Sequence, residues 1–289
     1  MFYKADIMSL PAEALVNKSL QLVSPPTTYS QVNDLLNDEN SSAEDISAII
    51  NLDPALTARL LKIVNSPFYG FPSQINTISR AITIIGTREL THLVLATSVI
   101  NAFRGIPANL INMADFWRHS LACAIASKQL AIHCGYRATE RFFISGLLNN
   151  IGSLVLYQAL PELAREAINS AKSGNGVISE SEKRVIGFDH CEAGAALVKA
   201  WKLPDSLGEV AKYHHTPSQA EEFPTEVAII HIADIIVSSA EIGNSGDRHV
   251  PPLDPKAWEL FNIDEQVLPE ILDQVREKLD DLTAVMTSS

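Results

Sequence analysis

The sequence is poor in cysteine, in positive charge and in long hydrophobic runs, and each scarcity excludes a class of protein. Its 289 residues include three cysteines, Cys123, Cys134 and Cys191, and no two of them form a CxxC pair. This low, odd count argues against a disulfide framework and a cysteine-based zinc site, and it is typical of a reducing compartment. We therefore expect a cytoplasmic protein.

Lysine and arginine together number 22 against 34 aspartates and glutamates, which gives a formal net charge of −12. An acidic chain without a basic run binds phosphate backbones poorly, so we expect no nucleic-acid partner. Residues 1–6 lack the layout of a signal peptide and no run of about 18 apolar residues occurs, so we expect no membrane partner. No glycine-rich phosphate loop or GxSxG turn supports nucleoside-triphosphatase or serine-hydrolase chemistry.

What the sequence does contain is helical periodicity. Apolar residues recur on one helix face within residues 56–64, behind Asp53 as the cap and Pro54 at the first helical position. No segment has the clear alternation of a β-strand, so the predicted fold class is all-α. In the second half we predict helices over residues 115–133, from Thr139 through Leu156, from Ser179 through Val198 with a Ser179–Glu182 capping box, and over residues 207–214, 225–240, 255–261 and 266–286.

The Gly-Ile-Pro stretch at residues 105–107 is the predicted domain boundary. It divides the chain into an N-terminal helical lobe, residues 1–107, and a helical bundle with a C-terminal helical extension, residues 108–289. Residues 243–247 are interpreted as a surface loop. Residues 67–72 carry three aromatic side chains, which either form a partner-binding surface or fold back between the two lobes.

Histidines and one aspartate are the candidates for chemistry. His231 and Asp234 lie three residues apart on one predicted helix, so both side chains can point the same way. Asp234 lies in an apolar stretch, where a buried carboxylate must be paired, hydrogen-bonded or metal-bound. His214 and His215 are adjacent, about 100° apart on a helix, so we expect at most one of them to face a shared site.

Imidazoles and a carboxylate from several helices can hold a divalent metal in an all-α bundle. Ordinary hydrogen-bonded core histidines are the simpler alternative. Cys123, four residues after His119, either joins such a metal site or is a buried inert thiol. The residues of interest for such a site are His119, His190, His214, His215 and His231, with Asp234.

The order of these residues resembles a known family. Residues 53–66, the aromatic loop and residues 78–86 are similar to the N-terminal half of the HDOD family. HDOD proteins are bacterial signalling domains, related to HD enzymes and generally regarded as non-catalytic. The resemblance covers residues 20–240 and implies an all-α, two-lobed protein with an HD-like bundle. The segments that resemble the core of the HD superfamily of metal-dependent phosphohydrolases are residues 116–120, 145–152, 187–195, 213–215 and 231–234.

The chain departs from the HD enzymes at one place. Where catalytic HD proteins carry a His-Asp doublet, this chain has Asn149-Asn150. The carboxylate of the doublet can bridge two metal ions about 3.5–4 Å apart, whereas asparagine offers only a neutral amide oxygen. In a relic pocket, the two amides would instead hydrogen-bond His119 and Asp234. The resemblance implies no catalytic residue, no required cofactor and a vestigial metal site with the candidates His119, Asn149, Asn150, His190, His214, His215 and Asp234. Without the doublet, the candidates for holding a single zinc, iron or manganese ion are His119, His190, one of His214 and His215, and Asp234.

The function that the resemblance implies is that of a bacterial signalling or regulatory protein that binds without turnover. Its partner would be a separate signalling protein or a small phosphorylated ligand. Arg59, Arg80 and Arg88 are candidate contacts for such a ligand, or they serve as caps and ion-pair partners. The alternative from a different class is a metal-dependent phosphohydrolase acting on a nucleotide or a cyclic dinucleotide, and a third is a structural oligomerisation unit.

Overall fold

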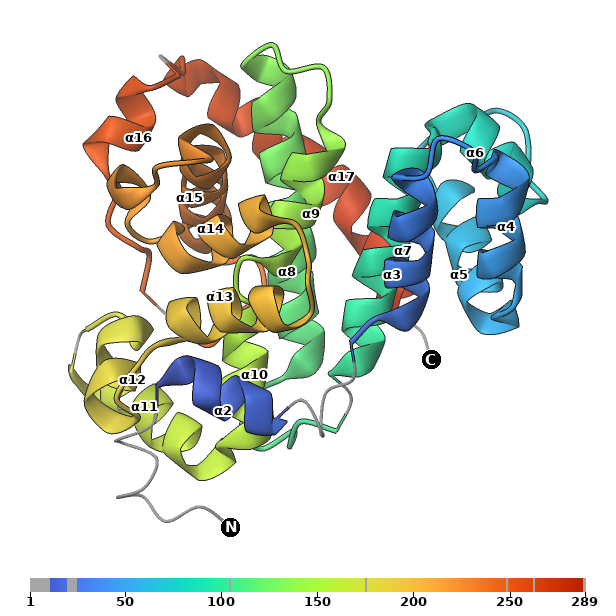
Figure 1. The fold of residues 1–289 in the computed structure, drawn as a ribbon. Coiled ribbons are helices and arrows are strands. Elements are labelled where there is room, and N and C mark those ends of the chain that lie inside the picture. Colours follow the sequence, from blue (N-terminus) through green and yellow to red (C-terminus); the bar gives the residue numbers. More distant parts are fainter. Residues whose placement is uncertain are drawn as a thin grey trace. The chain divides into compact units, whose positions relative to one another are not determined.

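The computed structural model describes residues 11–19, 25–103, 105–174, 176–247, 249–261 and 263–287. Within these ranges every regular element is a helix, so the predicted all-α fold class is confirmed (Figure 1). The chain forms two compact units, which we call the bundle unit and the lobe unit. The bundle unit comprises the described residues before 25 and within 105–275, and the lobe unit comprises residues 25–103 and 276–287.

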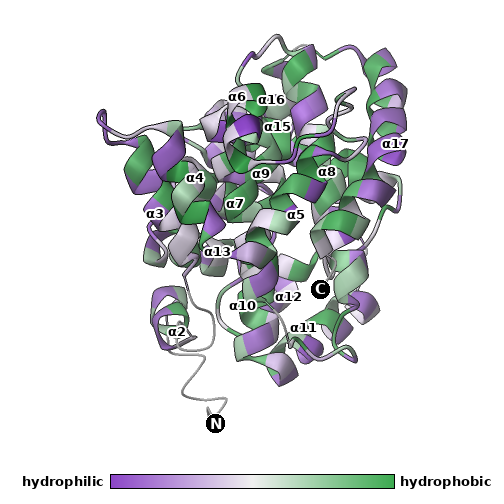
Figure 2. Cartoon of the chain, turned by 90° about the vertical axis from the view of Figure 1, so that its right-hand side faces the viewer, coloured by the Kyte–Doolittle hydropathy of each residue, from purple (hydrophilic) through white to green (hydrophobic). Residues whose placement is uncertain are grey.

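The bundle unit holds most of the helices. In α17, its last helix, the buried side chains recur every three or four positions, and Figure 2 shows hydrophilic residues along much of the rest. Residues of α17 after Val275 group with the lobe unit. The elements are α2 (Ala12–Ser19), α8 (Met113–His133), α9 (Glu140–Leu148), α10 (Ile151–Ala159), α11 (Pro161–Gly174), α12 (Ile178–Val185), α13 (His190–Ala200), α14 (Asp205–Tyr213), η1 (Pro217–Gln219), α15 (Pro224–Ser239), α16 (Pro255–Glu259), η2 (Glu265–Val267) and α17 (Leu268–Thr287).

The lobe unit begins with helices whose first residues follow local capping rules. The Ser42 hydroxyl and the Asp45 carboxylate each accept the other residue's backbone N–H, which forms a capping box. The Asp53 carboxylate accepts two N–H groups of the helix that Pro54 opens, as predicted. The helices are α3 (Thr27–Leu36), α4 (Ala43–Asn51), α5 (Pro54–Val64), α6 (Ile78–Ile85) and α7 (Thr87–Ala102).

Polar contacts within the lobe unit involve Tyr69 and Arg59, whose roles the sequence alone did not decide. The phenol of Tyr69, on the aromatic loop, donates a hydrogen bond to the buried Glu89 carboxylate of α7 at 2.5 Å. The guanidinium of Arg59 donates to the Asn101 side-chain oxygen at 2.7 Å. Tyr69 thus joins the aromatic loop to α7 of the same unit, and Arg59 of α5 is hydrogen-bonded to α7.

The division into units differs from the predicted one at both ends of the chain. Helix α2, which was expected in the N-terminal lobe, groups with the bundle unit because it packs against α10 and α13 and buries Leu15 and Val16. The last residues of α17, which were expected in the bundle, group with the lobe unit. Between these ends, the chain passes from one unit to the other at Gly105, the first residue of the predicted boundary.

The segment predicted as one helix from Thr139 through Leu156 is two helices, α9 and α10. They meet at Asn149 and Asn150, where the backbone leaves helical geometry at Asn150 (φ −95°, ψ 16°). A third helix, α13, approaches α10 at Gly152, where an added Cβ would lie 1.9 Å from the His190 carbonyl oxygen. The absence of a side chain at Gly152 therefore allows the Asn149-Asn150 junction to lie against the start of α13.

The predicted Ser179–Glu182 capping box is wrong. Helix α12 already begins at Ile178, so both residues lie within its first two turns. The box that the structure contains is made by Asp189 and Glu192, at the start of α13. Because Glu182 is not engaged as a cap, its carboxylate is available to the site described below.

Residues 140–159 are long and apolar enough to cross a membrane by length and composition. In the structure these residues form α9 and α10, and 89% of the most apolar 18-residue window within them is buried inside the protein. Helix α9 packs against α8 and α15, and α10 packs against α13. The apolar composition of this segment is thus explained by its burial in the protein core.

Candidate functional site

Two clusters of buried side chains in the bundle unit carry metal-ligand chemistry. In each cluster, one nitrogen, oxygen or sulfur atom per residue lies within 4.8 Å of those of all the other members. The aspartate cluster consists of His119 and Cys123 of α8 and Asp234 of α15. The histidine cluster consists of His190 and Cys191 at the start of α13, and His214 and His215 after α14.

The aspartate cluster is held by an ion pair. Asp234 Oδ1 lies 2.9 Å from Nε2 of His119, and Nδ1 of the same ring lies 3.2 Å from the Ile242 carbonyl oxygen. Burial alone would raise the pKa of Asp234, but the hydrogen bond and charge of His119, helped by His215 and His214, hold it well below its usual range. Asp234 is therefore an ionised carboxylate whose partner is His119.

His231, the other candidate partner of Asp234, is used elsewhere. Its Nδ1 donates to the His214 carbonyl oxygen at 2.7 Å, and its Nε2 accepts the Asp254 backbone N–H at 2.9 Å. Burial lowers the pKa of this imidazole. His231 is thus a neutral ring with both nitrogens hydrogen-bonded, and the shared helix does not bring it together with Asp234 in one site.

Cys123 belongs to the aspartate cluster as a thiol. Its sulfur lies 3.5 Å from His119 Nε2 and donates to Asp234 Oδ1 at 3.6 Å. Burial, followed by the charge of Asp234, raises the pKa of Cys123 well above its usual value. Cys123 is therefore a buried, protonated thiol next to His119, and its participation in a metal site stays a prediction.

His190 is oriented by a carboxylate that sequence reasoning assigned to a cap. Its Nδ1 lies 2.6 Å from Glu182 Oε2, and the same oxygen accepts the His190 backbone N–H at 2.9 Å. Burial opposes the charged ring, but the charge of Glu182 outweighs it and raises the pKa of His190 well above its usual value. Nothing in the sequence marks Glu182, since its partner lies in the next helix.

His214 offers a nitrogen with no partner. Its Nδ1 donates to the carbonyl oxygens of Ala211 and Val210 at 3.0 and 3.2 Å, which leaves the lone pair on Nε2. That Nε2 is buried and has no hydrogen-bond partner among the described residues. Burial, followed by the charge of His190, lowers the pKa of His214 to about 4. The ring is therefore neutral at physiological pH.

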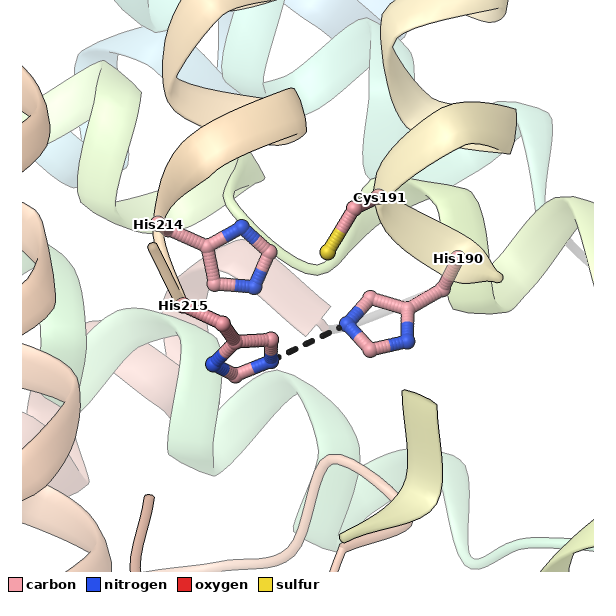
Figure 3. Close-up of side chains that lie close together, drawn as sticks. All are labelled: His190, Cys191, His214 and His215. Atoms are coloured by element: carbon pink, nitrogen blue, oxygen red, sulfur yellow. Dashed lines mark hydrogen bonds between the residues drawn. The ribbon is translucent and has the colours of Figure 1, made fainter. Parts of the chain in front are cut away.

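His215 also faces the cluster, which corrects the expectation that only one of the two adjacent histidines would. Its Nε2 lies 3.2 Å from His190 Nε2, and the rings of His214 and His215 are 4.0 Å apart (Figure 3). Burial, then the charges of His214 and His190, lowers the pKa of His215 well below its usual value. The 100° helical spacing does not apply here because α14 ends at Tyr213.

Asn149 and Asn150 do not make the predicted hydrogen bonds to His119 and Asp234. Asn149 is 1% exposed, and neither its amide oxygen nor its amide nitrogen has a partner among the described residues. The amide nitrogen of Asn150 is likewise buried and unpartnered. Buried polar groups are normally satisfied by protein or water, so these unpartnered amides are exceptions within the core.

A metal pair of the kind that HD enzymes hold does not fit these residues. Two divalent ions need a bridging carboxylate, and the junction offers two neutral amides in its place. Of the buried carboxylates that adjoin the clusters, Asp234 and Glu182 are each hydrogen-bonded to an imidazole, and Asp189 caps α13 and pairs with Lys183. The site therefore lacks the negative charge that a binuclear centre requires.

A cavity of about 350 Å³ reaches the aspartate cluster at His119. The segment interpreted as a surface loop forms part of its wall, and the backbone N–H of Asn244 in that loop donates to the Asp115 carbonyl oxygen at 3.0 Å. An added Cβ on Gly243 would lie 2.5 Å from the His119 backbone nitrogen. The loop is thus packed against α8 and does not extend freely from the surface.

Comparison with known proteins places this arrangement in a family. The model of the HDOD domain matches residues 22–217. An uncharacterised protein of Treponema pallidum is 26% identical over 214 residues, which cover 73% of this chain. The match covers 41% of that protein, so the chain spans about two fifths of the length of this curated relative.

Solved structures share the fold over nearly the whole chain. An HDOD protein of unknown function from Geobacter sulfurreducens has a TM-score of 0.78 at 22% identity and covers 95% of this chain and 97% of its own. A presumed phosphohydrolase from Shewanella amazonensis has a TM-score of 0.76 at 25% identity, covering 96% and 99%. A presumed signal transduction protein from Marinobacter aquaeolei has a TM-score of 0.70 at 17% identity, covering 99% and 69%.

Proposed function

The chain belongs to the HDOD family, and from that premise we propose that it is a cytoplasmic regulatory protein of bacterial signal transduction. It acts by binding a separate signalling protein or a small phosphorylated ligand, and it does not hydrolyse phosphoesters. The relatives support both a signalling and a phosphohydrolase interpretation, because one solved neighbour is named for each. The choice between the two therefore depends on the chemistry of the site.

The observation that carries the proposal is the pair of buried amides at the α9–α10 junction. Asn149 and Asn150 supply neither the imidazole nor the carboxylate of the enzymes that the fold resembles. Hydrolysis by a metal pair needs negative charge to hold both ions and to generate a bound hydroxide. Asp234 already compensates His119 through Oδ1, so this single carboxylate does not supply the negative charge that the missing doublet would add.

The test is turnover of phosphodiesters by the purified full chain in the presence of Mn²⁺. The substrates are a generic chromogenic phosphodiester, a mononucleotide and a cyclic dinucleotide. We expect rates equal to those of His119→Ala, a matched variant that lacks the imidazole which HD enzymes require. Manganese-dependent turnover that is present in the natural chain and absent in His119→Ala would contradict the proposal and establish the phosphohydrolase alternative.

A further inference from the structure

Beyond this binding function, we propose that the histidine cluster is a mononuclear site for a borderline transition metal, with zinc as the ion of choice. The ligands are Nε2 of His190, His214 and His215 and the sulfur of Cys191. Figure 3 shows the three rings and the sulfur turned toward one another. The site uses neither the Asn149-Asn150 junction nor Asp234, so it differs from a metal pair bridged at the junction.

The orientation of the rings is the first argument. Histidines that bind a metal through one nitrogen usually donate the other N–H to a carboxylate or a carbonyl oxygen, which fixes the ring and its tautomer. His190 meets this pattern through Glu182, and His214 meets it through the carbonyl oxygens of Ala211 and Val210. In both rings, Nε2 is the atom left to face the cluster.

The spacing of the donor atoms is the second argument. Zinc–nitrogen bonds of about 2.0 Å at a tetrahedral angle place two ligand nitrogens about 3.3 Å apart. Nε2 of His190 and Nε2 of His215 are 3.2 Å apart, and all four donor atoms lie within 4.8 Å of one another. The four donor atoms are therefore gathered closely enough for one ion to lie among them.

The unpartnered Nε2 of His214 is the third argument. A buried acceptor without a donor is unfavourable, and a cation at the centre of the cluster would satisfy it. Nε2 of His190 and Nε2 of His215 also face each other at 3.2 Å, so one ion between the two rings would contact both nitrogens. The deprotonated sulfur of Cys191 would supply negative charge, with Glu182 hydrogen-bonded behind His190.

The donor set also determines which metals fit. Imidazole and thiolate favour zinc and cobalt, whereas magnesium and calcium take oxygen ligands. Four protein ligands close a tetrahedral shell and leave no position for a substrate, which is the arrangement of a structural site. The ion would thus hold the start of α13 to the end of α14 without supplying hydrolytic chemistry.

The experiment is a titration of the chelator-treated full chain with Zn²⁺ and, for spectroscopy, with Co²⁺. We expect one ion per chain, strong visible absorption from tetrahedral cobalt and a near-ultraviolet band from the thiolate. His215→Ala is expected to weaken zinc binding at least tenfold, while the exposed His133→Ala, a matched histidine control, leaves it unchanged. No binding by the natural chain, or equal binding by His215→Ala and His133→Ala, would overturn the proposal.

A second pair of variants keeps the test sharp if His215→Ala does not fold. Cys191→Ser is expected to abolish the near-ultraviolet band of the cobalt protein and to weaken zinc binding, whereas Cys134→Ser preserves both. A thiolate band that survives in Cys191→Ser would exclude this ligand set. Because the readouts are stoichiometry and absorption, failure of the metal proposal is distinguishable from the appearance of hydrolytic turnover.

Discussion

The aspartate cluster and the histidine cluster are built from similar side chains, yet their polar atoms differ in how far they are satisfied. In the aspartate cluster every ionisable side chain has a partner, since His119 contacts Asp234 and the Ile242 carbonyl, and Cys123 donates to Asp234. In the histidine cluster, Nε2 of His214 has no partner among the described residues. We infer that the first cluster stabilises the fold, whereas the second is the proposed metal site.

Charge explains the difference. The aspartate cluster contains its own carboxylate in contact with an imidazole, so its opposite charges compensate each other inside the core. The histidine cluster brings three imidazoles together, and its carboxylate, Glu182, stands behind His190 and not among the rings. Two imidazole nitrogens that face each other with their lone pairs repel. A proton or a metal ion between them removes this repulsion.

Removal of Asp234 should give the largest effect on stability and would test whether the aspartate cluster is structural. Asp234→Ala leaves His119 buried without its counter-ion, so we expect the free energy of unfolding in urea to fall by about 3–5 kcal/mol. The half-buried His215→Ala, measured without metal, serves as the comparison and is expected to change stability by about 1 kcal/mol or less. Equal losses in the two variants would remove the distinction between the clusters.

Gly152→Ala is expected to act on the histidine cluster through the backbone. The added Cβ would lie 1.9 Å from the His190 carbonyl oxygen and 2.4 Å from the Gly194 nitrogen, so α10 and α13 must separate. We expect a loss of about 3 kcal/mol in the free energy of unfolding, at the upper end for overpacking, together with weaker zinc binding. The measurements are urea unfolding and zinc titration.

Gly174→Ala is the control for this variant, because no atom lies within 4 Å of its added Cβ. Alanine in place of an unrestrained helical glycine should leave stability unchanged or raise it by about 1 kcal/mol. If Gly152→Ala behaved like Gly174→Ala, the close approach of α10 to α13 would not be needed to shape the cluster.

Local sequence rules could predict the helices, but they could not predict which side chains from other helices contact the clusters. The cap at Asp53 and the proline after it act within one turn, so the start of α5 follows from neighbouring residues alone. The Glu182–His190 contact joins two helices, and the local Ser179-x-x-Glu182 pattern pointed to a capping box that does not form. Tertiary packing decided the role of Glu182.

The candidate site shows the same limit. The resemblance to HD proteins pointed to the histidines and the aspartate of the two clusters but not to Cys191, and it could not show which of these side chains pair. Helical spacing suggested that His231 and Asp234 act together. In the structure, Asp234 contacts His119 of α8, whereas His231 accepts the backbone N–H of Asp254, the residue before α16. The same spacing rule excluded joint use of His214 and His215, because the end of α14 at Tyr213 could not be located from periodicity.

Glu182→Gln would sharpen the comparison by changing only the group behind the histidine cluster. The amide keeps an acceptor oxygen for His190 but removes the negative charge, so we expect zinc affinity to fall ten- to a hundredfold while one ion per chain is retained. Calorimetric titration of the chelator-treated protein measures both quantities. Unchanged affinity would show that Glu182 orients His190 for packing alone and has no influence on an ion.

The smallest expected effect is a gain in stability at the unpartnered amide. Asn149→Leu replaces a buried side chain of similar volume whose amide atoms have no partners, so the free energy of unfolding should rise by about 1–2 kcal/mol. Asn169→Leu, at an exposed position of α11, is the matched control and should change stability by about 0.5 kcal/mol or less. A loss of stability in Asn149→Leu would mean that its amide is hydrogen-bonded in solution, and the junction would then resemble the saturated aspartate cluster more than the open histidine cluster.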